Sequence, residues 1–339
     1  MMSPRQDGIS LVEFMVAMTV GLFLIAGVGA TYLGNKGAFS EGRAVSVMQD
    51  NGRFSLETLS RDIRLAGFSG CMGAGNVSNK LNNSGNFLYN FGQALQGFHG
   101  SGSTWSPSLD AAIGGGVTPL AGTDVLTLRR AEGASYGLSA PSMAASTDAP
   151  HVDASLLAPD KLQQNQFVLV GDCTAAAVFQ ITNADAITSG LLRHAAGAGS
   201  PGNASADLGR AFGADAQATR MVTASYFLAP SAAVPGRNSL WQQTDGAAAV
   251  EMALGVDNLQ ILFGEDTDGD MTANRYVTAD LVSNMAGVVS LRLSLLISSD
   301  DNVAQASQPY TFNGVVVTPT DRRLRTVFTT VVNLRNRTP

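Results

Sequence analysis

The sequence has 339 residues, a formal net charge of −6 and only 14% charged residues. This length is enough for one large domain or two small ones. The acidic balance argues against a nucleic-acid partner, because no basic face is available to neutralise phosphates. Few charges together with many small polar residues favour an extracytoplasmic, β-rich protein over a cytosolic enzyme.

The chain begins with a long apolar segment that carries one carboxylate, Glu13. No charged residue occurs between Phe14 and Asn35, and a helix of that length spans about 30 Å, the hydrocarbon core of one bilayer. A cleaved secretory signal would have a shorter apolar core. An isolated carboxylate in hydrocarbon costs at least ~2.5–3.5 kcal/mol, so it marks a function or a partner unless Glu13 lies at the headgroups.

The helical pattern continues beyond the apolar segment. Apolar and small residues recur there at spacings of three and four, which draws one stripe along a helix: Val45, Met48, Gly52, Leu56, Leu59, Ile63 and Ala66. We therefore predict one helix over residues 9–68, with a transmembrane part at about 9–33 and an amphipathic second half. Several glycines in it predict local bending where the helix leaves lipid.

The start of the chain resembles the class III signal of type IV pilins and type II secretion pseudopilins. The resemblance is carried by Gly8, Ile9, Leu11, Glu13 and Phe14, followed by an apolar helix. It implies a leader over residues 1–8, cleavage by a prepilin peptidase between Gly8 and Ile9, and N-methylation of Ile9. It also implies that Glu13 pairs with an N-terminal amine, commonly that of a neighbouring subunit, during assembly.

Two further segments resemble PilW-type minor pilins. They are QDNGRFSLETLSRDIRLAGFSGC, from Gln49 to Cys71, and RLRTVFTTVVNLRNR, from Arg323 to Arg337. The resemblance implies a minor pilin that takes part in priming or assembly, or in the tip, of a type IV pilus. Its implied partners are other minor pilins, the major pilin, the prepilin peptidase and the assembly platform of the bacterial inner membrane. The globular domain would lie in the periplasm and then in the extracellular pilus.

Three alternatives remain at this stage. A minor pseudopilin of a type II secretion system has the same signal, and an adhesive tip protein would use its large domain to bind a surface. An inner-membrane hydrolase with one anchor is the third, but no nucleophile motif or metal spacing is present and the three histidines are far apart in sequence. We expect no enzymatic activity.

Residues 69–339 are predicted to form a β-rich globular domain. Period-two runs mark strands at residues 125–129, 166–170, 178–182, 221–228, 239–242, 289–297 and 328–334. The alternation in 289–297 predicts a half-buried antiparallel strand. Ala-, Gly- and Ser-rich stretches near 133–165 and 195–217 are predicted to be surface insertions. The fold class is α+β and pilin-like, with the helix packed on an antiparallel sheet.

Cys71 and Cys173 are the only cysteines, and neither belongs to a CxxC pair. In an oxidising compartment they predict one long-range disulfide, the alternative being two unrelated buried thiols.

One loop carries a possible cation site and no other cofactor is expected. In EDTDGDMTANRY, Asp266, Asp268 and Asp270 alternate, with Asn274 as a further oxygen donor. The spacing resembles the start of an EF-hand loop that binds Ca²⁺, although Met271 replaces the glycine and Val277 the bidentate glutamate. The alternative is a polar hairpin turn, which Asp-Gly favours.

Overall fold

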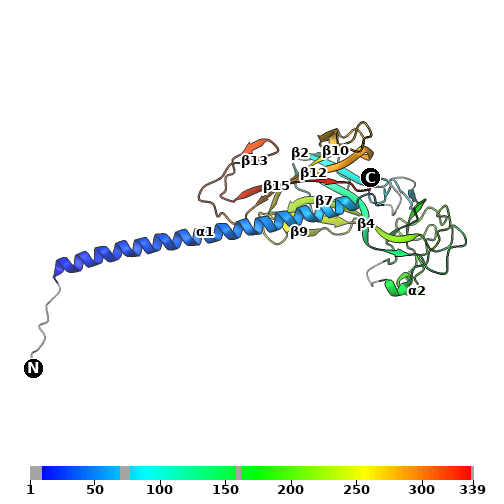
Figure 1. Cartoon of the computed structure of the whole chain (residues 1–339), viewed down its shortest axis with the longest axis horizontal. Coiled ribbons are helices and arrows are strands. Elements are labelled where there is room, and N and C mark those ends of the chain that lie inside the picture. Colours follow the sequence, from blue (N-terminus) through cyan, green and yellow to red (C-terminus); the bar gives the residue numbers. More distant parts are fainter. Residues whose placement is uncertain (1–9, 69–76, 158–161, 337–339) are drawn as a thin grey trace, which may run out of the picture.

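A computed structural model describes residues 10–68, 77–157 and 162–336. Helix α1 (Leu11–Leu65) is continuous over 55 residues and extends far beyond the β-rich domain that holds its C-terminal half (Figure 1). The glycines at 21, 27, 29, 34 and 37 do not interrupt it. The helix ends three residues before the predicted boundary of 68, because Ala66 is extended and forms a β-bridge with Arg130.

The larger sheet has nine strands. Its order is β1-β6-β5-β7-β4-β2-β3, with β8 paired to β7 and β9 paired to β8. All pairings are antiparallel except that of β1 with β6. The strands are β1 (Val77–Asn79), β2 (Leu95–Ser101), β3 (Thr104–Ser106), β4 (Val125–Gly137), β5 (Phe167–Gly171), β6 (Ala176–Gln180), β7 (Gln217–Pro230), β8 (Asn238–Thr244) and β9 (Val250–Leu254).

A second, four-stranded antiparallel sheet has the order β11-β10-β12-β15. Its strands are β10 (Val256–Glu265), β11 (Arg275–Val277), β12 (Val288–Ser298) and β15 (Arg325–Asn333). A separate hairpin pairs β13 (Tyr310–Phe312) with β14 (Val315–Val317), and the short helix α2 (Ala186–Ser189) lies outside both sheets. The α+β, pilin-like fold predicted from the sequence is confirmed: a long apolar helix followed by curled, mostly antiparallel sheet.

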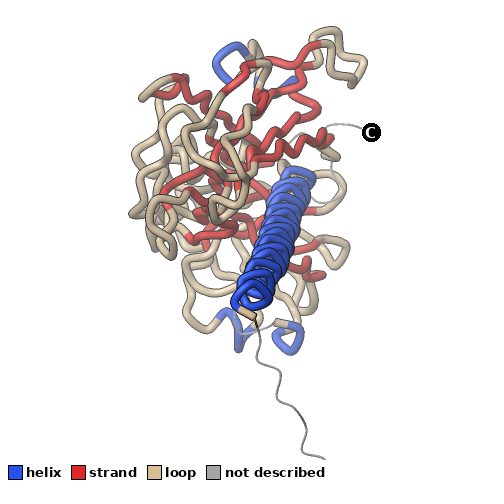
Figure 2. Tube along the Cα trace, turned by 90° about the vertical axis from the view of Figure 1, so that its left-hand side faces the viewer, coloured by secondary structure: helices blue, strands red, loops and turns tan. Residues whose placement is uncertain are grey.

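The main hydrophobic core lies between α1 and the two sheets. The helix contacts β15, β12, β9 and β4, and Figure 2 shows it lying across the strands. Leu59 and Ile63 have no exposed surface, and they meet leucines of β4 and β12. The stripe predicted from its three-and-four spacing is therefore the buried face of the helix, although Val45 at its start is exposed.

The two Ala-, Gly- and Ser-rich stretches differ from the prediction of surface insertions. Between β4 and β7 they pack with β5 and β6 around a second hydrophobic cluster, which includes Val152, Leu192, Leu208 and Phe212. Their small residues fill a lobe with its own core, because the apolar residues scattered among them converge in space although they are not periodic in sequence.

The seven predicted strands are all present. Most boundaries are shifted by a few residues, but β4 continues eight residues beyond the predicted end at residue 129. The sequence analysis missed β10, the strand that pairs along nearly the whole length of β12. Two consecutive polar residues, Asp257 and Asn258, interrupt the alternation near its start, where the pairing with β12 has a bulge. The buried side of β10 (Val256, Leu259, Ile261 and Phe263) belongs to the main core.

Candidate assembly surface

The N-terminal half of α1 is an apolar surface that no other part of the described chain covers. Its large side chains are exposed, from Leu11 at 75% to Phe39 at 76%. Such a surface is costly in water. By length and composition α1 is the only helix among the described residues that could cross a membrane. A membrane or neighbouring helices would remove this surface from water.

The first turn of α1 is held by a reciprocal capping box. The Ser10 hydroxyl accepts a hydrogen bond from the Glu13 backbone N–H at 3.2 Å, and Glu13 Oε2 accepts one from the Ser10 N–H at 3.0 Å. The pair satisfies two of the N–H groups that a helix start leaves open. A carboxylate in the first turn also interacts favourably with the helix dipole. Glu13 thus lies next to the chain end that cleavage after Gly8 would create.

Within the exposed half, two hydroxyls are satisfied by the helix itself. Thr19 donates to the carbonyl of Met15 at 2.7 Å and Thr31 to that of Gly27 at 2.9 Å. Such back-bonding removes the need for a partner outside the helix. Glu13 is then the only charged side chain between Leu11 and Asn35, so it is the natural centre for a specific contact there.

The second half of α1 is fixed to the sheet by close packing. A Cβ atom on Gly52 would lie only 2.7 Å from the ring of Phe328 on β15, so the ring approaches the helix backbone directly. Beside it, Asn51 Nδ2 donates to the carbonyl of Leu254 on β9 at 3.0 Å. At the far end, Asn336 Nδ2 donates to the Ala66 carbonyl at 2.9 Å, which satisfies a group that the helix end leaves open.

A buried polar cluster joins the last turns of α1 to the larger sheet. Asp62 is 1% exposed, its Oδ2 lies 2.9 Å from Arg130 Nε, and it accepts a very short hydrogen bond from the Tyr226 hydroxyl. Gln242 Nε2 donates to that hydroxyl at 2.6 Å. Burial raises the pKa of Tyr226, and the Asp62 charge raises it further, so the phenol stays protonated and donates. The sequence analysis missed this cluster: the apolar spacing around Asp62 was visible, but the partners 68 to 180 residues away were not.

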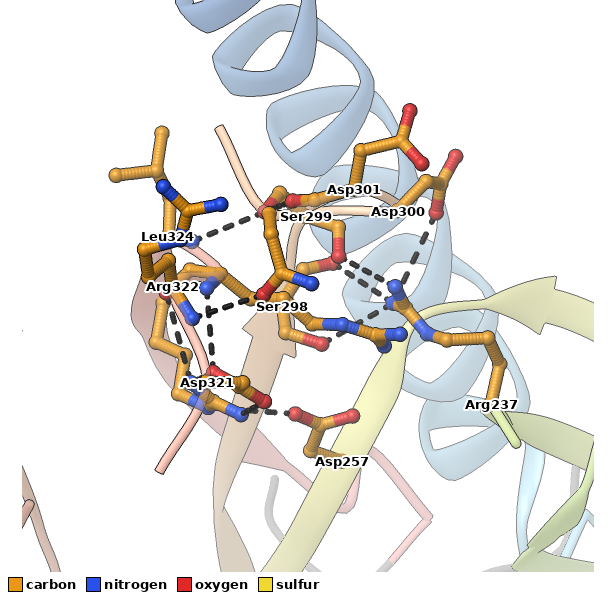
Figure 3. A network of polar contacts seen from close by, with 12 residues as sticks. Arg237, Asp257, Ser298, Ser299, Asp300, Asp301, Asp321, Arg322 and Leu324 are labelled. Atoms are coloured by element: carbon orange, nitrogen blue, oxygen red, sulfur yellow. Dashed lines mark hydrogen bonds and ion pairs between the residues drawn. The ribbon is translucent and has the colours of Figure 1, made fainter. Parts of the chain in front are cut away.

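A second polar network lies where α1 leaves the domain (Figure 3). Arg237 is 2% exposed, and it donates to Ser298 O and Ser298 Oγ, both at 3.1 Å, and to Ser299 O. Burial lowers the pKa of Arg237. Arg325 forms a bidentate pair with Asp321 at 2.7 and 2.8 Å, and these bonds hold the pKa of Asp321 at about 2. The network fixes the loop after β12 beside the start of β15.

The carboxylates of the candidate cation loop lie close together, but donors of the loop itself already form hydrogen bonds with its oxygen atoms. One oxygen of each of Asp266, Asp268 and Asp270 lies within 4.8 Å of the others. Asp266, however, already accepts backbone N–H bonds from Asp268, Gly269 and Met271, which lower its pKa. The oxygen of Asn274 accepts from Thr267, and its amide nitrogen donates to Asp268 at 3.1 Å. Asn274 therefore stabilises the turn in this structure; the carboxylates are the groups that could hold Ca²⁺.

Several predicted site residues lie outside the part of the chain that the structure describes. Gly8 and Ile9 of the cleavage site, and Cys71 of the predicted disulfide, are among them. Cys173 follows β5 in an exposed turn. Cleavage, N-methylation and the Cys71–Cys173 bridge therefore remain predictions.

The exposed apolar half of α1 could anchor the protein in a membrane, while strands of the two sheets pack against its second half. Residues 225–336 match the family model of PilW, the type IV pilus-assembly protein W. The matched segment begins in β7 and continues through β15, so it includes the four-stranded sheet and Phe328 but not the lobe. It supports involvement in type IV pilus assembly. No curated protein and no solved structure matches the chain.

Proposed function

We propose that this protein is a minor pilin that takes part in priming, assembly or the tip of a type IV pilus. The observation that carries the proposal is the exposed apolar half of α1, in which Glu13 is the only charged side chain before Lys36, attached to a domain whose residues 225–336 match the pilus-assembly family. A subunit built in this way can move from bilayer to filament without unfolding, because its domain makes no use of the exposed half.

Maturation would begin on the cytoplasmic side of the inner membrane. Prepilin peptidase would cut between Gly8 and Ile9, and the new amine on Ile9 would be N-methylated. Cleavage would leave a positive charge one residue before Ser10, whose N–H contacts Glu13. The free subunit would therefore hold its own N-terminus against Glu13.

Docking would exchange that local contact for one between subunits. Glu13 would pair with the amine of a neighbouring pilin, and a paired charge costs far less in an apolar environment than an isolated one. The pair would set the register between helices, while the apolar side chains from Leu11 to Phe39 supply the packing surface. The partners would be other minor pilins and the major pilin, delivered through the inner-membrane assembly platform. The work of the protein is assembly rather than catalysis.

Two alternatives use the same helix. A minor pseudopilin of a type II secretion system would dock identically, but the family match over residues 225–336 favours the pilus. An adhesive tip role would place ligand binding in the lobe between β4 and β7, which lies outside the matched segment.

Co-purification from membranes tests the proposal. Full-length protein with a C-terminal tag is extracted in mild detergent at native expression, and its partners are identified by mass spectrometry. We expect other minor pilins and the major pilin, and a mature chain that begins with N-methylated Ile9. Replacing Gly8 with a bulky residue should leave an uncut precursor. An intact Met1 in cells with active peptidase, or a partner set drawn from a secretion system, contradicts the proposal.

A further inference from the structure

A groove runs between α1 and the loop that follows β12, at the point where the helix leaves the domain. Its volume is about 340 Å³. The helix supplies residues at spacings of three and four along one face, and the loop supplies the opposite wall: the lining includes Lys36, Phe39, Arg43, Asp300, Asp301 and Val303. Cations thus line one side, carboxylates the other, and apolar groups lie between them.

The opposite charges of the groove do not neutralise one another. No ion pair joins the helix cations to the loop carboxylates in the described part of the chain, and there Lys36 and Arg43 have no acidic partner at all. Asp300 lies 3.7 Å from buried Arg237 and its side chain is 48% exposed. Among the described residues the carboxylate of Asp301 forms no hydrogen bond or ion pair; only its backbone carbonyl is bonded. Both walls therefore keep charge available for a bound molecule.

The acidic wall is held in place before anything binds. The Asp301 carbonyl accepts hydrogen bonds from Ser299 Oγ at 2.8 Å and from the Val303 N–H at 3.0 Å. Ser299 Oγ in turn accepts from the Leu324 N–H at 2.9 Å. Figure 3 shows Asp300 and Asp301 beside the helix, above this network. A preorganised loop loses little conformational freedom on binding.

The Lys36 end of the groove lies at headgroup depth if α1 spans the bilayer, and this step rests on the proposed function. Arg43 lies about 10 Å further from the bilayer along the helix, and its long side chain would have to reach back toward the headgroups. With Glu13 at one edge of the hydrocarbon, about twenty residues at 1.5 Å each reach the other edge near Leu33. Lys36 is then roughly 5 Å beyond it, inside a headgroup layer that is itself about 5–8 Å thick. Phe39, at 76% exposed, is placed where aromatic rings favour the interface.

We propose that the groove binds the headgroup of a phosphoethanolamine lipid while the subunit waits in the membrane. The phosphate lies against Lys36 and Arg43, and the primary ammonium donates hydrogen bonds to Asp300 and Asp301. A choline headgroup carries no N–H to donate. A glycerol headgroup carries no cation, so the carboxylates would face its phosphate without compensation. The site therefore selects ethanolamine over both, and it holds the domain in one orientation over the bilayer.

Native mass spectrometry of the delipidated full-length protein tests the site. The protein is mixed with equal amounts of phosphatidylethanolamine, phosphatidylcholine and phosphatidylglycerol that have the same acyl chains. We expect one phosphatidylethanolamine adduct to dominate. Lys36→Gln and Arg43→Gln should each lower that adduct roughly fivefold, the effect of about one charge at a membrane surface. Asp300→Asn with Asp301→Asn should reduce phosphatidylethanolamine to the level of phosphatidylcholine.

Arg53→Gln and Asp280→Asn are matched controls, because both residues are exposed and lie outside the groove; they should leave the adducts unchanged. Equal adducts of all three lipids, a preference for phosphatidylglycerol, or ethanolamine selectivity that survives the double asparagine variant would overturn the proposal. Failure of the proposed function gives a different result: phosphatidylethanolamine would still bind, but the protein would not co-purify with pilins.

Discussion

The two halves of α1 have similar backbones and opposite surroundings. From Leu11 to Phe39 the helix exposes apolar side chains on every side, whereas from Met48 to Ile63 one face is buried against two sheets. The position of the buried half is determined by contacts within the protein, namely its packing on the sheets and the Asp62 cluster. The exposed half has no such contacts, so we expect lipid and neighbouring subunits to determine its position. Changes in the buried half should therefore alter folding, and changes in the exposed half should alter insertion and assembly.

The largest effect is expected at Asp62. Asp62→Ala removes the carboxylate 2.9 Å from the buried Arg130 Nε and leaves Arg130 only the longer contact with Glu132 at 3.5 Å. Breaking such a buried pair costs ~3–5 kcal/mol. Urea unfolding of the full-length protein in detergent, followed by the fluorescence of buried Trp241, measures the change. Arg61→Ala is the control: Arg61 also contacts Asp62, at 3.5 Å, but its side chain is 72% exposed, so the loss should stay below ~1 kcal/mol. Equal losses in the two variants would contradict the assignment of Asp62 as the anchor.

Two glycines of the same helix sharpen the comparison. Gly52→Ala places a Cβ 2.7 Å from the Phe328 ring and should destabilise the domain by ~1–3 kcal/mol through overpacking. Gly42→Ala meets no atom within 4 Å and should stabilise the helix by ~0.5–1 kcal/mol. Both changes are read from the same unfolding curves. If the two substitutions shift stability in the same direction, the close approach at Gly52 is not what fixes the helix.

A smaller effect is expected from calcium, far from the exposed half. Millimolar Ca²⁺ should raise the melting temperature of the protein, since a site with a dissociation constant of ~10⁻⁴–10⁻³ M adds ~0.4–1.4 kcal/mol at 1 mM. Asp268→Ala should abolish the rise, and Mg²⁺ should give less. Thermal unfolding curves with calcium and with chelator test this prediction. Coincident curves would show that the loop binds no Ca²⁺ and is a turn stabilised by Asn274.

The smallest effect concerns the network where α1 leaves the domain. Because Arg325 holds the pKa of Asp321 at about 2, below its unfolded value near 4, the carboxylate contributes stability above pH 4. That contribution is lost as the pH falls from about 4 to about 2. With a side chain 35% exposed, solvent screening limits the loss to less than ~1 kcal/mol. Comparing the pH dependence of the free energy of unfolding in wild type and Asp321→Asn isolates the contribution of this carboxylate. Superimposable profiles would show that Asp321 makes no pH-dependent contribution to stability.

The sequence predicted the fold well where one local pattern carries the information. The stripe from Met48 to Ala66 and the alternation in β12 each bury an apolar face, and both appear as expected. Strand β10 was not predicted because a bulge at Asp257–Asn258 interrupts its alternation, and the core of the lobe was not predicted because its apolar residues are not periodic.

For the candidate surface, the apolar segment and Glu13 were visible as a local pattern. The Ser10 partner of Glu13, the partners of Asp62 and the charged groove beside Lys36 were not. Such contacts depend on which distant segments meet, and the spacing of residues in a sequence does not encode this directly.

We propose that Glu13 acts between subunits rather than within its own domain. Filament number per cell, counted by electron microscopy at native expression levels, tests it in Glu13→Ala, with membrane insertion and domain stability measured alongside. We expect the variant to insert and fold normally, because among the described residues the Glu13 side chain forms a hydrogen bond only with Ser10, while the number of filaments should drop sharply. Unchanged piliation in Glu13→Ala would contradict it.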